Sequence, residues 1–420
     1  MRPLEDIWTS IRSYNCRHGD EEEQGHELLD ELIVFLVELI QAEFLPEFRR
    51  SIFDWQWQQM QRTVAEWPVP TRDSFDWLGR VGKGGYATVF AVQCKRTGHV
   101  YAMKRIDKRL IKQKKQQKAV ELEKQLMAQI KSPFVAGLHC SYQDETHVTL
   151  GMDMIAGGDI EAYMTRKGPF PESVVKYLMA EIILGLKHLH ERGIMHRDIK
   201  PANVLVTHDG HAVLSDLGLV TFVQNPSLQC LLLEIEDAGA GGSLSHGHEI
   251  QYGDFTVRKS PHGTVYVNGN RIKPHARGKA GTPGFWAPEM LRRDNDGRPG
   301  KYTGTADWWS IGCLLYAMLL GVGPFTVLGG DTNDDNNETL NGSVVLPHGR
   351  IGADARSLIA QLLVRDPAQR LGNKGAWEVM AHPFFEGVEW ALLEARTLPP
   401  PWRPPLGVVN AQPDVPGEKE

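Results

Sequence analysis

The chain has 420 residues, of which 41% are hydrophobic and 23% are charged, so it is long enough to bury a large core in two or three domains. Its net charge of −6 is mild for this length and gives no reason to expect a nucleic acid partner. The five cysteines are scattered without a CxxC pair, no signal-peptide pattern is present, and the longest apolar run, 32–40, is too short to span a bilayer. These features predict a cytoplasmic protein with free thiols.

The first region of the chain has a helical pattern. Residues 26–68 carry apolar side chains at helical spacing, which predicts two amphipathic helices with a wide apolar face. Two such helices cannot bury that face alone, so they must dock on another part of a protein. The proline-marked stretch 67–73 predicts a linker. We therefore expect a short helical segment over residues 1–70, separate from the rest of the chain.

At Phe75 the pattern changes to short β-rich segments, and a glycine-rich turn, 82–87, lies between two of them. The backbone amides of such a turn can cover phosphate oxygens, with Tyr86 at its tip excluding water. A purely structural hairpin explains the turn alone equally well. The strand 100–104 alternates so that Lys104 lies on the same side as the glycines, and a lysine in an apolar strand needs an acidic partner.

Residues 194–206 carry the strongest chemical signal, an H-R-D-x-K-x-x-N loop inside an apolar hairpin. In phosphoryl transfer, Asp198 would accept the proton of the substrate hydroxyl and Lys200 would neutralise the γ-phosphate. Asn203, and Asp216 from the SDLG stretch, would hold the Mg²⁺ ions that bridge the phosphates. A base and a metal ligand five residues apart on one rigid loop can reach opposite sides of the same phosphate.

Three further motifs follow in order. GTPGFWAPEM supplies Thr282 and Glu289, a buried helix opens with Asp307, and RDPAQRLG supplies Arg370 to pair with Glu289. Seven motifs in the correct order exclude coincidence. Over about 75–390 the chain resembles a eukaryotic Ser/Thr protein kinase.

This resemblance implies an α+β fold, the bilobal protein kinase fold, after the short N-terminal helical segment. The small β-rich N-lobe would cover 75–155 and the larger helical C-lobe 156–387. Together they would form a kinase domain over 75–387.

The resemblance also implies which residues bind and activate ATP. It selects Glu123 over Glu121 as the partner of Lys104, because Glu123 stands ten residues before Pro133, as in related kinases. The positions that match the nucleotide-binding residues of the family are Val81, Gly82, Lys83, Gly84, Gly85, Tyr86, Ala87, Val89, Ala102, Lys104, Met152, Asp153, Ile155, Asp159 and Leu205. ATP and Mg²⁺ are the implied cofactors.

Among kinases, the stretches MAEIILGLKHLHERG, SDLGLV and EWALLEARTLPPPWRPPLGVVNA resemble the AGC group, and within it the G-protein-coupled receptor kinases. That family usually carries Asp-Leu-Gly, so Leu217 is compatible with activity and can stack with Met127, Leu138 and His196 between the lobes. The stretch VELIQAEFLPEFRRSIFDWQW resembles the last helices of the regulator-of-G-protein-signalling homology domain that precedes the kinase in that family. Residues 388–420 resemble a truncated AGC C-terminal tail.

Two alanines argue against the commoner Arg-directed AGC kinases. Those kinases carry glutamates at the positions of Ala202 and Ala317, and each glutamate gives a charge-assisted contact to a substrate arginine worth roughly 1.5–3 kcal/mol. Asp159 remains but has a competing role on the ATP ribose, and Arg277 and Lys279 would tolerate acidic substrates. We therefore expect a protein substrate that is not selected by arginine, which the family resemblance suggests is an activated membrane receptor.

The activation segment is unusually long, and residues 223–272 are interpreted as an insertion. Within it, 255–272 alternates around PHG and NGN turns and predicts a small β-hairpin. A surface loop is the simpler interpretation, and a docking or autoinhibitory element is the alternative. His246, His248 and His262 have no fixed spacing, so we expect no metal site there.

Many AGC kinases need a phosphothreonine four residues before the Thr of G-T-P, where it pairs with the Arg of H-R-D. Counting back from Thr282 gives Gly278, and no Ser or Thr lies in 265–281. Arg197 then has no nearby phosphate to bind. We expect no dependence on phosphorylation at that site.

The basic run 104–118 carries eight Lys or Arg in fifteen residues. A solvated helix face is the simpler interpretation, and peripheral contact with an anionic membrane, at about 1 kcal/mol per basic residue, is the alternative. We expect a monomer. The rival functions are a kinase-fold scaffold, disfavoured by the intact phosphoryl-transfer residues, and another AGC kinase with a different substrate.

Overall fold

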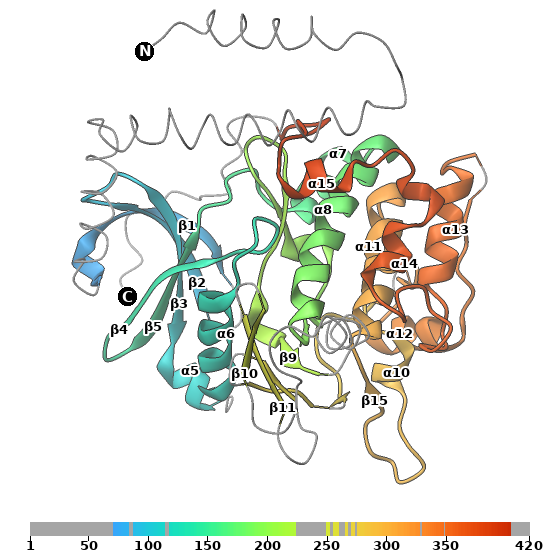
Figure 1. The fold of residues 1–420 in the computed structure, drawn as a ribbon, viewed down its shortest axis with the longest axis horizontal. Coiled ribbons are helices and arrows are strands. Elements are labelled where there is room, and N and C mark those ends of the chain that lie inside the picture. Colours follow the sequence, from blue (N-terminus) through green and yellow to red (C-terminus); the bar gives the residue numbers. More distant parts are fainter. Residues whose placement is uncertain are drawn as a thin grey trace, which may run out of the picture. The chain divides into compact units, whose positions relative to one another are not determined.

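A computed structural model describes residues 70–404, except for gaps at 84–86, 114–116, 224–248, 253–254, 260–264, 268–269, 274, 328–329 and 348. The chain divides into two units, Met1–Val69 and Pro70–Glu420, and the described residues belong to the second (Figure 1). The helices predicted for 26–68, and the part of the predicted tail beyond Pro404, lie outside the described residues.

The N-lobe is built on an antiparallel sheet of five strands in the order β1-β2-β3-β5-β4 (Figure 1). The strands are β1 (Phe75–Lys83), β2 (Ala87–Cys94), β3 (Val100–Asp107), β4 (Leu138–Gln143) and β5 (His147–Asp153). Alternation along β3 turns Ala102 and Lys104 to the same face of the sheet. The register places Lys104 between Val89 of β2 and Leu150 of β5, so the lysine lies among apolar neighbours.

Two helices come after β3, namely α5 (Lys108–Gln113) and α6 (Gln117–Gln129). Helix α6 is attached through Leu126 and Met127, which are buried in the core of the protein. Arg109 and Lys112 on α5 are exposed, as a solvated helix face predicts.

The C-lobe is centred on two long helices, α8 (Glu172–Glu191) and α11 (Thr305–Leu320). Most of the residues of both helices are buried, because they are apolar on more than one face. Trp308 and Trp309 in the first turn of α11 are fully buried, and Gly321 ends that helix in the left-handed region with a φ of 84°. The other helices of the lobe are α7 (Ile160–Lys167), α10 (Pro288–Leu291), α12 (Thr332–Asn341), α13 (Ala353–Leu362), α14 (Ala376–Met380) and α15 (Trp390–Glu394).

Three two-stranded sheets fix the loops that follow α8. Strand β6 (Ile194–Met195) pairs with β9 (Thr221–Phe222), β7 (Val204–Val206) pairs with β8 (Ala212–Leu214), and β14 (Ala276–Arg277) pairs with β15 (Lys301–Tyr302). The loop between β6 and β7 carries the H-R-D motif, so both of its ends are fixed by hydrogen-bonded strands.

The activation segment contains a separate antiparallel sheet of β10 (Glu249–Tyr252), β11 (Phe255–Lys259), β12 (Val265–Val267) and β13 (Asn270–Arg271), drawn in yellow-green tones in Figure 1. The hairpin predicted for 255–272 is confirmed by β11 and β12, and β10 and β13 extend it to four strands. Val223, before the inserted sheet, forms a parallel bridge with Lys273, after it, so the two ends of the inserted segment lie side by side.

No three His, Cys, Asp or Glu side chains gather as a metal site within the part of the chain that the structure describes. His246, His248 and His262 lie outside it.

The chain after α15 runs without helix or strand from 398 to 404, as its prolines predict. Trp402 anchors this strap, because its ring packs edge-on against Tyr163, at 4.9 Å between centroids, and Phe170, at 5.2 Å. Among the described residues, no helix is both long enough and apolar enough to cross a membrane.

Candidate active site

A cleft of about 390 Å³ lies between the N-lobe sheet and the C-lobe. Predicted nucleotide-binding residues that line it are Val81, Gly82, Ala87, Val89, Ala102, Lys104, Met152, Asp153, Ile155, Asp159 and Leu205. Lys83 ends β1, whereas Gly84, Gly85 and Tyr86 lie outside the described residues. Met127, Ala202 and Leu217, which the sequence analysis names for other reasons, also line the cleft, and the lining residues that it does not name are Ala136, Met154, Ala156, Gly158 and Ser215.

Lys104 joins two carboxylates at the back of this cleft. Its Nζ lies 2.7 Å from Oε1 of Glu123 and 2.9 Å from Oδ1 of Asp216. Glu121, the alternative partner, instead accepts a hydrogen bond from Gln125 on the same helix. The predicted pairing with Glu123 is therefore present, and it ties α6 to the sheet.

The electrostatics of this cluster favour the charged forms. Burial opposes the charge on Lys104, but the carboxylates of Glu123 and Asp216 outweigh it and raise the pKa of the ammonium group. Burial likewise opposes the charge on Asp216, but the positive charge and hydrogen bond of Lys104 lower its pKa overall. Asp216 is therefore an anion at neutral pH and presents a carboxylate to the cleft.

The backbone directs Asp216 into the cleft. Asp216 has a φ of 58° and a ψ of 77°, in the left-handed region that Asp enters more easily than most residues. Leu217, the next residue, is only 1% exposed and packs in the same core as Met127. Nε2 of His196 lies 3.1 Å from the carbonyl oxygen of Ser215. The leucine thus serves as an apolar anchor, while the aspartate stays in the cleft.

Asp198 lies in the H-R-D loop between β6 and β7 and is only 6% exposed. Nδ2 of Asn203 donates to its Oδ2 at 2.8 Å, and Nζ of Lys200 lies 3.2 Å from the same oxygen. The hydroxyl of Thr282 donates to Oδ1 of Asp198 at 2.7 Å and accepts from Lys200 at 2.6 Å. Because the amide nitrogen of Asn203 is used in this way, its carbonyl oxygen is the atom available to a cation.

Asp307, in the first turn of α11, binds the backbone of this loop. It accepts hydrogen bonds from the amides of His196 and Arg197, at 2.9 and 2.8 Å, and from Nε2 of His190 at 2.8 Å. Burial raises the pKa of Asp307, but these donors outweigh it and lower the pKa overall. The predicted aspartate at the start of α11 therefore fixes the geometry of the catalytic loop without reaching the cleft.

Glu289 and Arg370 form the pair that the sequence predicts. Nη1 and Nη2 of Arg370 donate to the two carboxylate oxygens of Glu289 at 2.7 and 2.9 Å, and Nη1 also donates to the carbonyl of Thr305 at 2.8 Å. The Arg370 side chain is fully buried. This bidentate pair connects the end of the activation segment to the C-lobe core.

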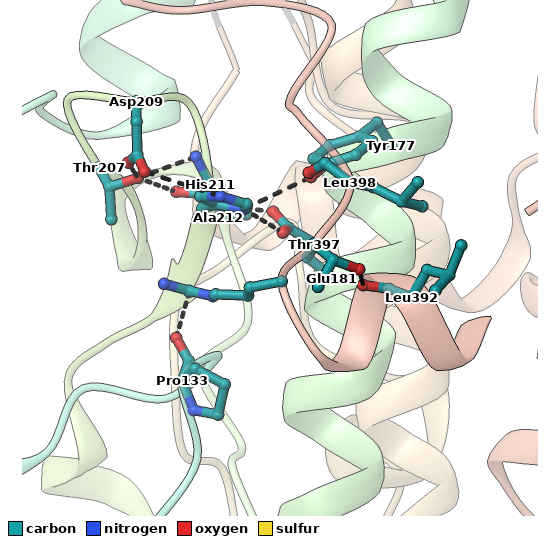
Figure 2. A network of polar contacts seen from close by, with 11 residues as sticks. Pro133, Tyr177, Glu181, Thr207, Asp209, His211, Ala212, Leu392, Thr397 and Leu398 are labelled. Atoms are coloured by element: carbon teal, nitrogen blue, oxygen red, sulfur yellow. Dashed lines mark hydrogen bonds and ion pairs between the residues drawn. The ribbon is translucent and has the colours of Figure 1, made fainter. Parts of the chain in front are cut away.

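A buried network that the motifs do not indicate lies behind the β7–β8 hairpin (Figure 2). Glu181 of α8 accepts from the backbone amide of Ala212 at 2.7 Å and lies 2.6 Å from Nδ1 of His211. The hydroxyl of Tyr177 donates to the carbonyl of Leu398 at 3.0 Å, which attaches the C-terminal strap to the same helix. This network supports the hairpin that carries Leu205 into the cleft.

The turn between α15 and the strap also contacts the loop after α6. The guanidinium of Arg396 donates to the carbonyl of Pro133 and lies 5.1 Å from the centroid of the Phe134 ring. The segment just before the N-lobe strand β4 is thus linked to the end of α15 (Figure 2).

The residues expected to set substrate preference differ in how accessible they are to a substrate. Ala202 lines the cleft, whereas Ala317 is buried within α11. Oδ1 of Asp159 accepts from the amide of Ala162 as the N-cap of α7. Arg277 is engaged by Asp294, at 3.4 Å, and by the carbonyl of Pro299. Exposed Lys279, with its Nζ 5.1 Å from the centroid of the Trp286 ring, is therefore the cation that remains accessible beside the loop of Thr282.

The protein kinase domain family model matches residues 75–234 and 250–385, which is more than half of the chain. The α+β, bilobal fold predicted from the sequence agrees with this match. The gap between the two matched stretches, 235–249, is shorter than the insertion expected over 223–272.

Curated relatives include several receptor kinases. The chain is 32% identical over 364 residues to G protein-coupled receptor kinase 2 of Caenorhabditis elegans, which covers 85% of this chain and 43% of the relative. It is 31% identical over 363 residues to human beta-adrenergic receptor kinase 1, and the match covers 85% of this chain and 44% of the relative. It is 33% identical over 341 residues to protein kinase 3 of Dictyostelium discoideum, and the match covers 81% of this chain and 32% of the relative. The predicted resemblance to receptor kinases is confirmed, and the chain spans less than two thirds of the length of these relatives.

Proposed function

The chain belongs to the protein kinase family, and we propose that it is an ATP-dependent Ser/Thr kinase that transfers the γ-phosphoryl group of MgATP to a protein hydroxyl. The single observation that carries this proposal is the simultaneous contact of Lys104 with Glu123 and Asp216, in a cleft that is also lined by Asn203, the hydrogen-bond partner of Asp198. A kinase domain implies ATP and a divalent cation, and we assign Mg²⁺ because Asn203 and Asp216 offer oxygen ligands.

Each residue then has a defined role. Asp198 accepts the proton as the hydroxyl oxygen bonds to the γ-phosphorus and the bond from that phosphorus to the bridging oxygen of ADP breaks. Lys104 orients the phosphates, Lys200 neutralises charge on the transferred group, and Thr282 positions both Lys200 and Asp198 through its hydroxyl. Asn203 and Asp216 would hold the cation.

We further propose a receptor-kinase-like substrate range. The names of two relatives say that they act on G-protein-coupled and beta-adrenergic receptors. Ala202 and Ala317 remove the carboxylates that select arginine, which supports the same assignment. We assign a monomeric, cytoplasmic enzyme whose substrate is an activated membrane receptor, and which contacts the membrane only peripherally.

The test is a phosphorylation assay with Mg²⁺ and ATP on acidic and basic peptide libraries, with Asp198→Asn as the matched inactive control. Phosphate transfer by the wild type but not by the variant supports the proposal. Nucleotide binding without any transfer would replace it with the kinase-fold scaffold.

A further inference from the structure

The inserted sheet β10–β13 has two unlike faces. Val257 and Val267 on one face are buried in the same core as the C-lobe helices. On the other face, Arg258 of β11, Tyr266 of β12 and Arg271 of β13 stand in one row, because they are register partners across three strands, and Glu249 of β10 is the register partner of Arg258 at the end of that row. Both arginines are exposed. The apolar face therefore fixes the sheet, and the other face presents a basic row to solvent.

Tyr266 orients one of these arginines. The guanidinium carbon of Arg258 lies 4.5 Å from the centroid of the Tyr266 ring. A stacked guanidinium has one flat side covered, while the N–H groups along its edge remain available to a carboxylate. The side chain is thus ordered before a ligand arrives, which lowers the entropic cost of binding.

The sequence that carries this row is rich in positive charge, although Glu249 on β10 is the register partner of Arg258. Residues 255–288 contain six Lys or Arg and no Asp or Glu, although the whole chain carries a net charge of −6. Lys273 and Lys279 are exposed and continue the basic residues toward Thr282. A ligand on the sheet therefore meets a positive field that extends to the active site.

The surroundings of β14 support a positive local potential. Burial and the positive charges of Lys301 and Arg277 lower the pKa of His275. Asp294 forms an ion pair with Arg277 at 3.4 Å, and Asp296 forms one with Arg298 at 3.2 Å. These two carboxylates therefore neutralise arginines outside the inserted sheet, and not the arginines on it.

The sheet is also anchored beside the catalytic loop. The amide of Val223 donates to the carbonyl of Gly193 at 2.8 Å, and Val223 bridges to Lys273 at the base of the sheet. Gly193 directly precedes β6, which leads into the loop of Asp198. A segment bound to the sheet is thereby held close to the loop that carries Asp198.

We infer that the outer face of the inserted sheet, formed by Arg258, Tyr266, Arg271 and Lys273, is a docking surface for an acidic segment of the protein substrate, distinct from the stretch that enters the cleft. The inference rests on the proposed kinase function. A peptide fits better than a membrane, because none of the large hydrophobic side chains exposed in the described part of the chain lies on this sheet. Membrane surfaces combine basic residues with such side chains.

The kinetic test compares two peptides with the same serine in a neutral context. One carries a run of Asp and Glu joined by Gly-Ser linkers of graded length, and the other carries Gln and Asn in that run. For Arg258→Gln/Arg271→Gln we expect KM for the acidic peptide to rise about three- to tenfold, with kcat and the KM of the neutral peptide unchanged. Arg258→Lys/Arg271→Lys keeps the charge and should recover most of the loss.

Controls address folding and general charge. Lys131→Gln/Arg350→Gln removes two exposed basic residues away from the sheet and should leave KM for the acidic peptide unchanged. Equal thermal unfolding midpoints of all variants would establish that the sheet is folded. Equal KM values for both peptides in the wild type and the Gln variant would overturn the inference.

A binding measurement separates this inference from the proposed function. Fluorescence anisotropy with an acidic peptide whose serine is replaced by alanine reports docking without phosphate transfer, and added salt should weaken it. Binding that depends on the two arginines, in a protein that phosphorylates nothing, supports docking and removes the kinase proposal. If the Gln variant loses binding to vesicles of phosphatidylcholine and phosphatidylserine but keeps peptide binding and KM, the surface faces a membrane and the inference is wrong.

Discussion

The hydroxyl of Tyr302 donates a hydrogen bond of 2.8 Å to the carbonyl of Gly278, the position at which an activating phosphothreonine is expected in many AGC kinases. Nη1 of Arg197 lies 3.5 Å from the same hydroxyl, and its Nε donates to the carbonyl of Leu219 at 2.5 Å. The H-R-D arginine is thus linked to the activation segment by neutral groups. We therefore expect that a phosphate at this point is not required to order the segment.

The first prediction concerns phosphatase treatment. The purified protein should keep its initial rate after dephosphorylation, and Ser260→Ala/Thr264→Ala should keep it too, since neither residue is needed when Tyr302 supplies the contact. Tyr302→Phe should lower the rate, because it removes a hydrogen bond worth about 1 kcal/mol. A collapse of activity after phosphatase, or in the double variant, would show that the inserted segment carries a phospho-switch.

The second prediction separates the base from the metal ligand. Asp198→Asn should lower kcat roughly 10²–10⁴-fold with little change in ATP binding, because the base acts on the acceptor hydroxyl. Asp216→Asn should instead weaken binding of MgATP, since it removes an anionic ligand that Lys104 keeps charged. Steady-state kinetics and nucleotide titration with and without Mg²⁺ distinguish the two. Equal losses of nucleotide affinity in both variants would contradict these roles.

Much of this site is predictable from sequence, because its residues lie in short motifs of fixed spacing. The pair of Lys104 and Glu123 follows from the alternation of one strand and the distance of the glutamate from Pro133. Glu289 and Arg370 lie 81 residues apart, yet each stands in its own motif. A short motif is sufficient to predict each residue of such a pair, because the known fold then brings the two motifs together.

Other parts have no local signature. Glu181 and His211 meet across 30 residues, and although Glu181 lies in the MAEIILGLKHLHERG stretch, no spacing in the sequence marks the two as a buried pair. Arg277 is basic and exposed by pattern, but its capture by Asp294 depends on the pairing of β14 with β15. Strand β10 is four residues long and gives too short an alternation to be recognised.

The third prediction concerns peptide selectivity. Because Ala202 and Ala317 supply no carboxylate, Arg at the second and third positions before the acceptor should raise kcat/KM little in a peptide array. Ala202→Glu should introduce a gain of about tenfold for arginine, since residue 202 lines the cleft. A strong preference of the wild type for arginine would contradict the receptor-kinase placement.

The fourth prediction tests the buried pair at the end of the activation segment. Arg370→Met leaves the carboxylate of Glu289 buried without its bidentate partner and should lower the free energy of unfolding by about 3–5 kcal/mol. The double variant Glu289→Gln/Arg370→Met should recover part of that loss, because no uncompensated charge remains. Urea unfolding followed by tryptophan fluorescence measures both. Additive losses in the double variant would mean that the two side chains act independently.

The last prediction concerns pH and the pair formed by His139 and Asp153 at the edge of the cleft. Nε2 of His139 lies 2.5 Å from Oδ1 of Asp153, and the hydrogen bond to this carboxylate raises the pKa of the imidazole above its ordinary 6.5 despite partial burial. Its stabilisation is therefore fully present below pH 6.5 and is lost as the pH rises through the higher pKa of the folded state. With 45% of the His139 side chain exposed, the contribution should not exceed about 1 kcal/mol. Thermal unfolding of the wild type and His139→Gln from about pH 5.5 to about pH 8.5 should show the largest difference at the acid end. Asp153→Asn should abolish the same pH-dependent difference, and a gap between wild type and His139→Gln that widens with rising pH would reverse the assigned sign.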